Sequence, residues 1–333
     1  MCFGLSGMLL SGCSHKAFRS AAGNSRTLPP AIAADFSYVR QANPTAKVKI
    51  LEQKSDYTIR RVELAAPGGT DTNRWIELDY YHVNAKEPTP VLMVLPMLGG
   101  GYSLEKHFAN YFASRGYAAV IVRRDRRQKT MQIEDLNRLL KEMVLDHRRV
   151  IDWLESQEDL DCSRLGIFGV SMGGIKGAIL LPLEDRIKAA ALGLCAGDLP
   201  YILTHTTEPG LVKRREQELK NRGITLEESE KRLRKMITCD PMTYASYVDP
   251  KKVLLVLGRY DDVVPYEKGV ELKEKMGNPE TILLPAGHYT AVLSIPYIKS
   301  QSFEFFEKRF AESSGRLADK RGGNVSKIQA GRR

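Results

Sequence analysis

The sequence lacks any run of about 18 consecutive apolar residues, the length that an ordinary transmembrane helix requires. Its five cysteines show no spacing typical of a metal site and imply no disulfide. Aromatic residues are not interleaved with basic ones as in proteins that bind single-stranded nucleic acid. With 43% hydrophobic residues over 333 positions, the chain is long enough for one large globular domain or two small ones.

The net formal charge of +10 is concentrated in two segments of the chain. Residues 213–235 carry nine basic and five acidic side chains, and residues 312–333 carry six and two. Together they supply eight of the ten excess charges. This pattern favours solvated surface segments, so no nucleic-acid partner is expected. A binder of nucleic acid or of an anionic surface is the alternative that the charge alone leaves open.

The first residues resemble a bacterial lipoprotein signal. An apolar run over residues 3–10 leads into Leu10-Ser11-Gly12-Cys13, and cleavage before Cys13 would expose that cysteine for lipid attachment. No Lys or Arg precedes the apolar run, which departs from such signals. The resemblance implies residues 1–13 as a signal, a lipid anchor and a place in the bacterial cell envelope; a cytoplasmic protein is the alternative. Residues 14–45, rich in small residues and proline, are then expected to be a tether.

Residues 46–310 have the pattern of a folded α/β domain. Alternating apolar and polar residues predict three strands, over 47–53, 57–66 and 74–83. Continuous apolar runs predict strands that are buried on both faces, at 90–96, 117–123, 164–168, 189–194, 253–257 and 281–284. The order predicts a mostly parallel central sheet with antiparallel N-terminal strands and helices on both faces.

A serine flanked by glycines lies between the strand at 164–168 and a helix that begins after it, in the sequence Gly169-Val170-Ser171-Met172-Gly173-Gly174. A serine on so sharp a turn needs neighbours without side chains, which Gly169 and Gly173 provide. The N–H of Met172 then lies at a helix N-terminus, where it can stabilise negative charge beside the Ser171 hydroxyl. A glycine-rich turn that only requires tight packing is the structural alternative.

Two further motifs follow predicted strands. Asp261 lies in Gly-x-x-Asp-x-x-Val-Pro after the strand at 253–257, and His288 follows Gly287 after the last strand. With Ser171, the order Ser, Asp, His over residues 48–310 resembles the α/β-hydrolase superfamily. The segment before the serine resembles most the dienelactone-hydrolase and prolyl-oligopeptidase-like branch.

The resemblance implies a role for each residue of this set. Ser171 would be the nucleophile, His288 its general base, and Asp261 the carboxylate that orients His288. Asp262 and Asp198 are rival acids.

The loop Met97 to Gly101 follows the strand at 90–96 and can supply a second oxyanion donor, or it can be a flexible turn. The donors would be the N–H groups of Met172 and of Leu98, with Met97 as the alternative to Leu98. Many family members carry His-Gly where this chain has Pro96-Met97. The mechanism requires no cofactor and no metal.

The expected reaction is hydrolysis of a small-molecule ester through an acyl-serine intermediate. A peptidase, a thioesterase or an acyltransferase would use the same residues, and a non-catalytic binding protein of the same fold is the alternative of another class.

Three other segments carry expectations. Residues 198–249 are charged and helical, split at Gly223, and too long for one crossover; we interpret them as a lid, with a surface excursion as the alternative. The cluster at 123–127 is expected to form structural ion pairs, the alternative being contact with an anionic substrate group. Residues 311–333 are expected to form a disordered basic tail. His147, on an apolar helix face, is expected to be packed rather than catalytic.

Overall fold

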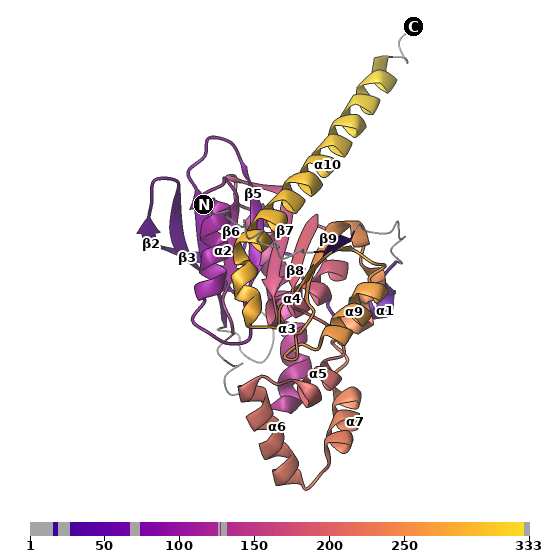
Figure 1. The fold of residues 1–333 in the computed structure, drawn as a ribbon. Coiled ribbons are helices and arrows are strands. Elements are labelled where there is room, and N and C mark those ends of the chain that lie inside the picture. The colour runs from indigo at the N-terminus through magenta and orange to yellow at the C-terminus, as the bar shows by residue number, and fades with distance from the viewer. Residues whose placement is uncertain (1–15, 19–26, 67–73, 126, 128–131, 330–333) are drawn as a thin grey trace, which may run out of the picture.

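The computed structural model of the protein describes residues 16–18, 27–66, 74–125, 127 and 132–329. The predicted signal and Cys13 lie outside these residues. The described strands form one ten-stranded sheet in the order β1-β10-β9-β8-β7-β5-β6-β4-β3-β2, which runs through the centre of the molecule (Figure 1).

Six adjacent strands of the sheet are parallel: β5 (Thr89–Leu95), β6 (Ala118–Val122), β7 (Leu160–Val170), β8 (Ala189–Gly193), β9 (Val253–Gly258) and β10 (Glu280–Leu284). Antiparallel pairing adds β4 (Trp75–Val83), β3 (Tyr57–Ala65) and β2 (Ala46–Gln53) beyond β6. At the opposite edge, β1 (Lys16–Phe18) pairs antiparallel with β10. The predicted mixed sheet is confirmed. Strands β5, β6, β8 and β9 are buried along their whole length because helices cover both faces.

Helices α2 (Ser103–Ala113) and α10 (Ile295–Gln329) cover one face of the sheet. An aromatic cluster packs these helices against the sheet. The ring centroids of Phe108 and Phe168 are 4.1 Å apart, and those of Phe112 and Phe306 are 5.9 Å apart. Helices α3 (Leu136–Glu155), α4 (Met172–Leu180) and α9 (Tyr266–Lys275) cover the other face. This arrangement is the α/β-hydrolase fold.

Between β8 and β9 the chain forms α5 (Leu199–His205), α6 (Pro209–Arg222), α7 (Leu226–Met236) and α8 (Pro241–Tyr244). Figure 1 shows α6 and α7 as a hairpin that projects beyond the sheet. Gly223 ends α6 with a left-handed φ of 63°, and Thr225 begins α7 with a capping box to Glu228.

The prediction of a tether over residues 14–45 is wrong for its described part. Residues 16–18 form β1, and α1 (Pro30–Ala34) leads to Phe36, whose side chain is fully buried. The Phe36 ring contacts Tyr244 edge to face, and its carbonyl accepts a hydrogen bond of 2.7 Å from Arg148. Burial of one large aromatic ring stabilises this docking by about 2 kcal/mol, a gain that small-residue composition did not reveal.

The expectation of a disordered tail is also wrong for its described part. The segment after residue 310 continues α10 as a helix to Gln329. It contains no proline, and adding residues to an existing helix is far less costly than nucleating one. Helix α2 begins at Ser103, and Tyr102 occupies its capping position with a left-handed φ of 65°. None of the described helices combines the length and the hydropathy that a membrane-spanning segment requires.

Candidate active site

Ser171 stands at the junction of β7 and α4 in a strained backbone conformation. Its φ of 56° and ψ of −124° lie in a region that residues with a Cβ rarely occupy. The neighbouring strand helps to hold it there, since the N–H of Ser171 donates to the carbonyl of Gly193 at 2.8 Å.

The glycines around Ser171 permit backbone contacts that no other residue would allow. A Cβ on Gly169 would lie 2.4 Å from the carbonyl oxygen of Gly173, and a Cβ on Gly173 would lie 2.1 Å from that of Leu95. Both distances are far below van der Waals contact. The predicted crowding at this turn is confirmed, and α4 therefore sits directly against the end of β5.

His288, in the loop after β10, reaches Ser171 from across the sheet. Its Nε2 atom lies 3.1 Å from Ser171 Oγ, within hydrogen-bond distance. The His288 side chain is 10% exposed, so one edge of the ring remains open to a substrate.

Asp261, in the loop after β9, holds the other side of that ring. Its Oδ2 atom lies 2.8 Å from His288 Nδ1, and its Oδ1 atom accepts hydrogen bonds from the N–H groups of Val263 and Val264 at 3.1 and 2.9 Å. The Asp261 side chain is almost fully buried. These contacts place the Nδ1 proton toward the carboxylate and leave the Nε2 lone pair facing Ser171.

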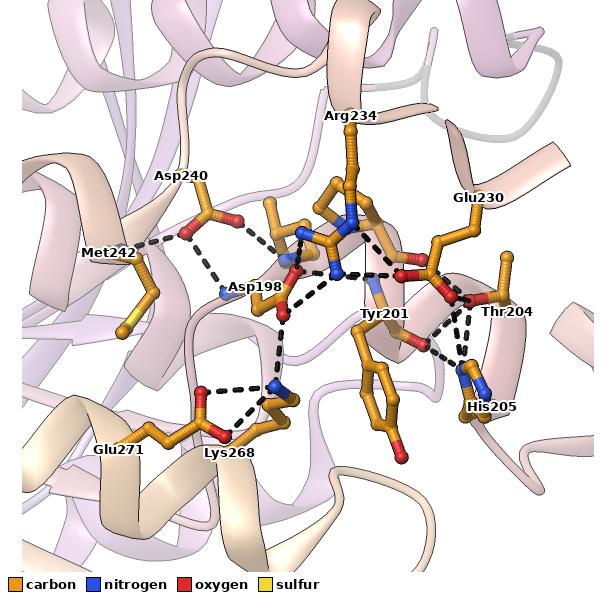
Figure 2. Close-up of polar contacts among 12 residues, drawn as sticks. Asp198, Tyr201, Thr204, His205, Glu230, Arg234, Asp240, Met242, Lys268 and Glu271 are labelled. Carbon is orange, nitrogen blue, oxygen red and sulfur yellow. Dashed lines mark hydrogen bonds and ion pairs between the residues drawn. The ribbon is translucent and has the colours of Figure 1, made fainter. Parts of the chain in front are cut away.

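The structure separates both rival acids from His288. Figure 2 shows Asp198 between Arg234 and Lys268, with Oδ1–Nη1 at 2.8 Å and Oδ2–Nζ at 3.1 Å. Partial burial opposes ionisation of Asp198, but the hydrogen bonds from Arg234 and Lys268 outweigh it and hold the pKa of this carboxyl below its ordinary value. Asp198 therefore connects the insertion to α9 through its ion pair with Lys268. The other rival acid, Asp262, is exposed to solvent.

The loop after β5 is fixed by polar contacts from three elements. The N–H of Met97 donates to Glu105 Oε1 on α2 at 2.9 Å, so it is already engaged. Arg124, after β6, donates to the carbonyls of Met97 and Gly99 at 3.1 and 2.7 Å and also to that of Gly100. Of the two proposed loop donors, this geometry favours Leu98.

Lys176 on α4 completes this loop clamp, by which we mean Glu105, Arg124 and Lys176. Its Nζ atom donates to the carbonyl of Pro96 at 3.2 Å from a buried position. Sequence reasoning missed Glu105 and Lys176 as parts of the site, and it offered Arg124 only within the cluster at 123–127, as the alternative of contact with an anionic substrate group. Lys176 carried a signal, because it is the one charged residue in an otherwise small and apolar helix.

Three other histidines that the structure describes make contacts with neighbouring structural residues and not with Ser171 or Asp261. His147 is buried on α3, as expected, with Nδ1 bonded to the carbonyl of Met143; burial and the Lys176 charge lower its pKa to about 4. His82 pairs with Asp159 at 2.6 Å, and His205 stacks on Tyr201 within the network of Figure 2.

The model of the prolyl oligopeptidase family, Peptidase_S9, matches residues 103–281, which is more than half of the chain. The chain belongs to this family. The matched segment contains Ser171 and Asp261 and ends before His288. The predicted membership of the α/β-hydrolase superfamily, and of its prolyl-oligopeptidase-like branch, is thereby confirmed.

Solved structures of esterases and of a peptidase share the fold of this prolyl oligopeptidase family member. Acetyl xylan esterase 1 from Thermoanaerobacterium sp. JW/SL YS485 is 15% identical with a TM-score of 0.58, over 84% of this chain and 96% of that one. Acetyl xylan esterase from Paenibacillus sp. R4 is 20% identical with a TM-score of 0.57, over 82% of this chain and 99% of that one. The acylaminoacyl peptidase of Pyrococcus horikoshii is 15% identical with a TM-score of 0.56. That match covers 77% of this chain and 42% of the peptidase.

Among curated proteins, an uncharacterized protein of Mycobacterium tuberculosis strain H37Rv is 28% identical over 175 residues. This match covers 52% of the chain and 38% of the relative's length, so the two share a segment rather than their whole length.

Proposed function

We propose that this protein is a serine hydrolase that cleaves an ester through an acyl-serine intermediate. The observation that carries the proposal is the continuous line from Ser171 Oγ to His288 Nε2 at 3.1 Å and from His288 Nδ1 to Asp261 at 2.8 Å. This geometry allows one proton to pass from the hydroxyl to the imidazole while the oxygen attacks.

In the first half-reaction, His288 Nε2 removes the Ser171 proton as Oγ forms a bond to the ester carbonyl carbon. The carbonyl oxygen becomes an oxyanion, which the N–H groups of Met172 and Leu98 stabilise. Met172 is the first residue of α4, so its N–H has no acceptor within the helix. When the tetrahedral intermediate collapses, the leaving alcohol takes the proton from His288, and the acyl group stays on Ser171.

In the second half-reaction, water replaces the alcohol. His288 removes a proton from water as its oxygen attacks the acyl carbon, and the collapse of the second intermediate returns that proton to Ser171 Oγ. The acid leaves, and the enzyme is regenerated. Asp261 stabilises the imidazolium in both halves without itself accepting the proton.

The surroundings of His288 favour a substrate with an apolar portion. Tyr289 and Tyr260, beside His288 and Asp261, are 62% and 69% exposed, and Leu293 in the following turn is 83% exposed. The insertion lies close by, because the N–H of Thr207 donates to the carbonyl of Asp262 at 3.3 Å. These contacts support the interpretation of residues 198–249 as a lid beside the substrate.

The first experiment is labelling with a fluorophosphonate probe, which reacts with activated serines. We expect the parent protein to be labelled and Ser171→Ala and His288→Ala to remain unlabelled, while circular dichroism shows all three folded. Labelling of folded Ser171→Ala would contradict the assignment of the nucleophile. No labelling of the parent, even after removal of α6 and α7, would favour the non-catalytic binding protein.

A panel of matched substrates separates the reactions that these residues could perform. An ester, a thioester and a peptide anilide with the same acyl group share the acyl-enzyme but differ in the leaving group. We expect the ester to give the highest kcat/KM. A higher value for the anilide would assign the protein to the peptidases, and transfer to an added alcohol in preference to water would make it an acyltransferase.

We also propose that Cys13 is the site of lipid attachment and that the protein is anchored in a bacterial envelope. The support is the resemblance of residues 1–13 to a lipoprotein signal. Cys13→Ser is expected to move the protein from the membrane fraction to the soluble fraction. Identical fractionation of parent and variant would overturn this proposal and leave the hydrolase proposal untouched.

A further inference from the structure

A cavity of about 200 Å³ lies where α3, the start of β4 and the end of β6 meet α4. The described side chains that line it do not include Ser171, Asp261 or His288. Trp75 and Arg127, which are 36% and 38% exposed, form its outer wall, so the cavity is open to solvent. The volume suits a molecule of several heavy atoms rather than a single water.

Cations outnumber acids around this cavity. The described part of its lining contains five cationic side chains, Arg74, Arg123, Arg124, Arg127 and Lys176, and three acidic ones, Glu77, Asp125 and Asp146. The five positive charges exceed the three negative ones by two. A cavity with this excess attracts an anion.

Ion pairs within the wall neutralise part of this charge. Arg74 makes a two-pronged pair with Asp146 at 2.6 and 2.7 Å, and Arg127 pairs with Asp125 at 2.5 Å. The pairing expected for the cluster at 123–127 is therefore present.

Lys176 lacks such a partner. Its side chain is 3% exposed, and its described hydrogen bond goes to a neutral carbonyl, that of Pro96. No described carboxylate lies within 4.0 Å of its Nζ atom. Arg124 lines the same cavity and likewise donates to backbone carbonyls. Its Nη1 atom lies 3.9 Å from Glu105 Oε1. A buried ammonium without an anion is costly, and it has donors left for a ligand.

His147 supplies a second, independent observation at the closed end of the cavity. Its Nδ1 atom is bonded to the Met143 carbonyl, whereas its Nε2 atom is buried without a hydrogen-bond partner among the described residues. Buried polar atoms in native proteins are almost always satisfied. Because Nδ1 carries the proton toward that carbonyl and the ring is neutral near pH 7, the Nε2 atom can accept an O–H from a ligand.

We propose that this cavity is a binding site for a small carboxylate, with Lys176 and Arg124 on the carboxylate oxygens and His147 Nε2 at the closed end. The carboxylate belongs either to a free ligand or to the substrate itself. The site shares Lys176 and Arg124 with the loop clamp, so its occupation acts on the loop that carries Leu98. Binding itself does not rest on the proposed hydrolase function.

Binding of malonate to the full chain, measured by isothermal titration calorimetry, tests the proposal without any turnover. We expect saturable binding by the parent and a Kd that rises by about tenfold or more in Lys176→Met, which keeps the volume and removes the charge. Lys106→Met, at an exposed position on α2 outside the cavity, removes the same charge and should leave the Kd unchanged. No binding by the parent, or equal binding by Lys176→Met, overturns the proposal.

The pH dependence gives a second readout. Burial and the charge of Arg124 lower the pKa of Lys176 to about 7, and a bound carboxylate favours the charged form. Malonate affinity is therefore expected to fall as the pH rises above about 7. The charged and titratable groups that face Lys176 across the cavity are Arg124, Glu105, His147, Asp125, Asp146, Arg74, Arg123, Arg127 and Glu77. A malonate affinity that does not fall between about pH 7 and 9 contradicts the role of Lys176.

Two kinetic experiments distinguish a carboxylate that belongs to the substrate from one that belongs to a free ligand. If the group belongs to the substrate, a malonate monoester is cleaved with a higher kcat/KM than its neutral diester, and free malonate raises the KM of the monoester. If the ligand is free, malonate changes kcat for a neutral ester. Should Lys176→Met fail to fold, Arg124→Ala removes the other cation assigned to the carboxylate oxygens, and unchanged malonate binding by that variant overturns the proposal.

Discussion

The Nε2 atom of His288 lies 3.1 Å from the Oγ atom of Ser171, although 117 positions separate the two residues in the chain. They meet because β7 and β10 are parallel strands of one sheet, with β8 and β9 between them, so their following loops emerge at the same edge. Asp261 emerges there as well, after β9. The role of each residue around Ser171 and His288 can therefore be tested by comparing its variant with a matched control variant.

Asp261→Asn should lower kcat by about 10⁴-fold while leaving the fold intact, because the amide no longer stabilises the useful tautomer of His288. Asp262→Asn is the matched control, an exposed neighbour that should change kcat little. Steady-state kinetics on one ester, with circular dichroism of both variants, measures the difference. A larger loss in Asp262→Asn would mean that the acid has been misassigned.

Gly173→Ala should destabilise the protein by about 2 kcal/mol or more, because its Cβ would lie 2.1 Å from the backbone oxygen of Leu95 and no rotamer can relieve that clash. Gly101→Ala is the control, since a Cβ there meets nothing within 4 Å. Thermal unfolding of the two variants compares them. Equal midpoints would show that α4 can move away from β5 at little cost.

Arg124→Ala should reduce kcat by about 10²-fold through displacement of the loop that carries Leu98, with a small change in thermal midpoint. Arg115→Ala is the matched control, because both arginines stack on a tyrosine, at 4.0 and 3.8 Å from the ring centroid, but Arg115 lies on the surface. An Arg124→Ala enzyme with unchanged kcat and a raised KM would place the residue in substrate binding instead of loop positioning.

Lys176→Met should stabilise the protein most strongly below about pH 7. The folded protein holds the pKa of Lys176 at about 7, whereas the ordinary value is 10.5. Between these two pH values the Lys176 side chain is therefore protonated in the unfolded chain and neutral in the folded protein. Stability of the parent therefore rises with pH across this window, and the advantage of the variant shrinks.

Thermal midpoints of parent and variant between about pH 7 and 10, in buffers without carboxylate or phosphate, give the comparison for Lys176→Met. A constant difference across this range would show that Lys176 does not change its protonation on folding.

The prediction of the sheet succeeded because strand patterns are local. Continuous apolar runs mark strands buried on two faces, and the glycine-serine turn at Ser171 needs residue types that can be read directly. The tether failed for the opposite reason, since the burial of Phe36 depends on Tyr244, which lies far away in sequence.

The sequence by itself determined the succession of strands along the chain, the identity of the elbow serine and a short set of acids and histidines to accompany it. The tertiary structure decided which of these meet: it joined Asp261 to His288, tied Asp198 to Arg234, and engaged the N–H of Met97 with Glu105. The physical reason is that hydrogen bonds act over about 3 Å between side chains whose separation is set by strand order and packing, which no local pattern encodes.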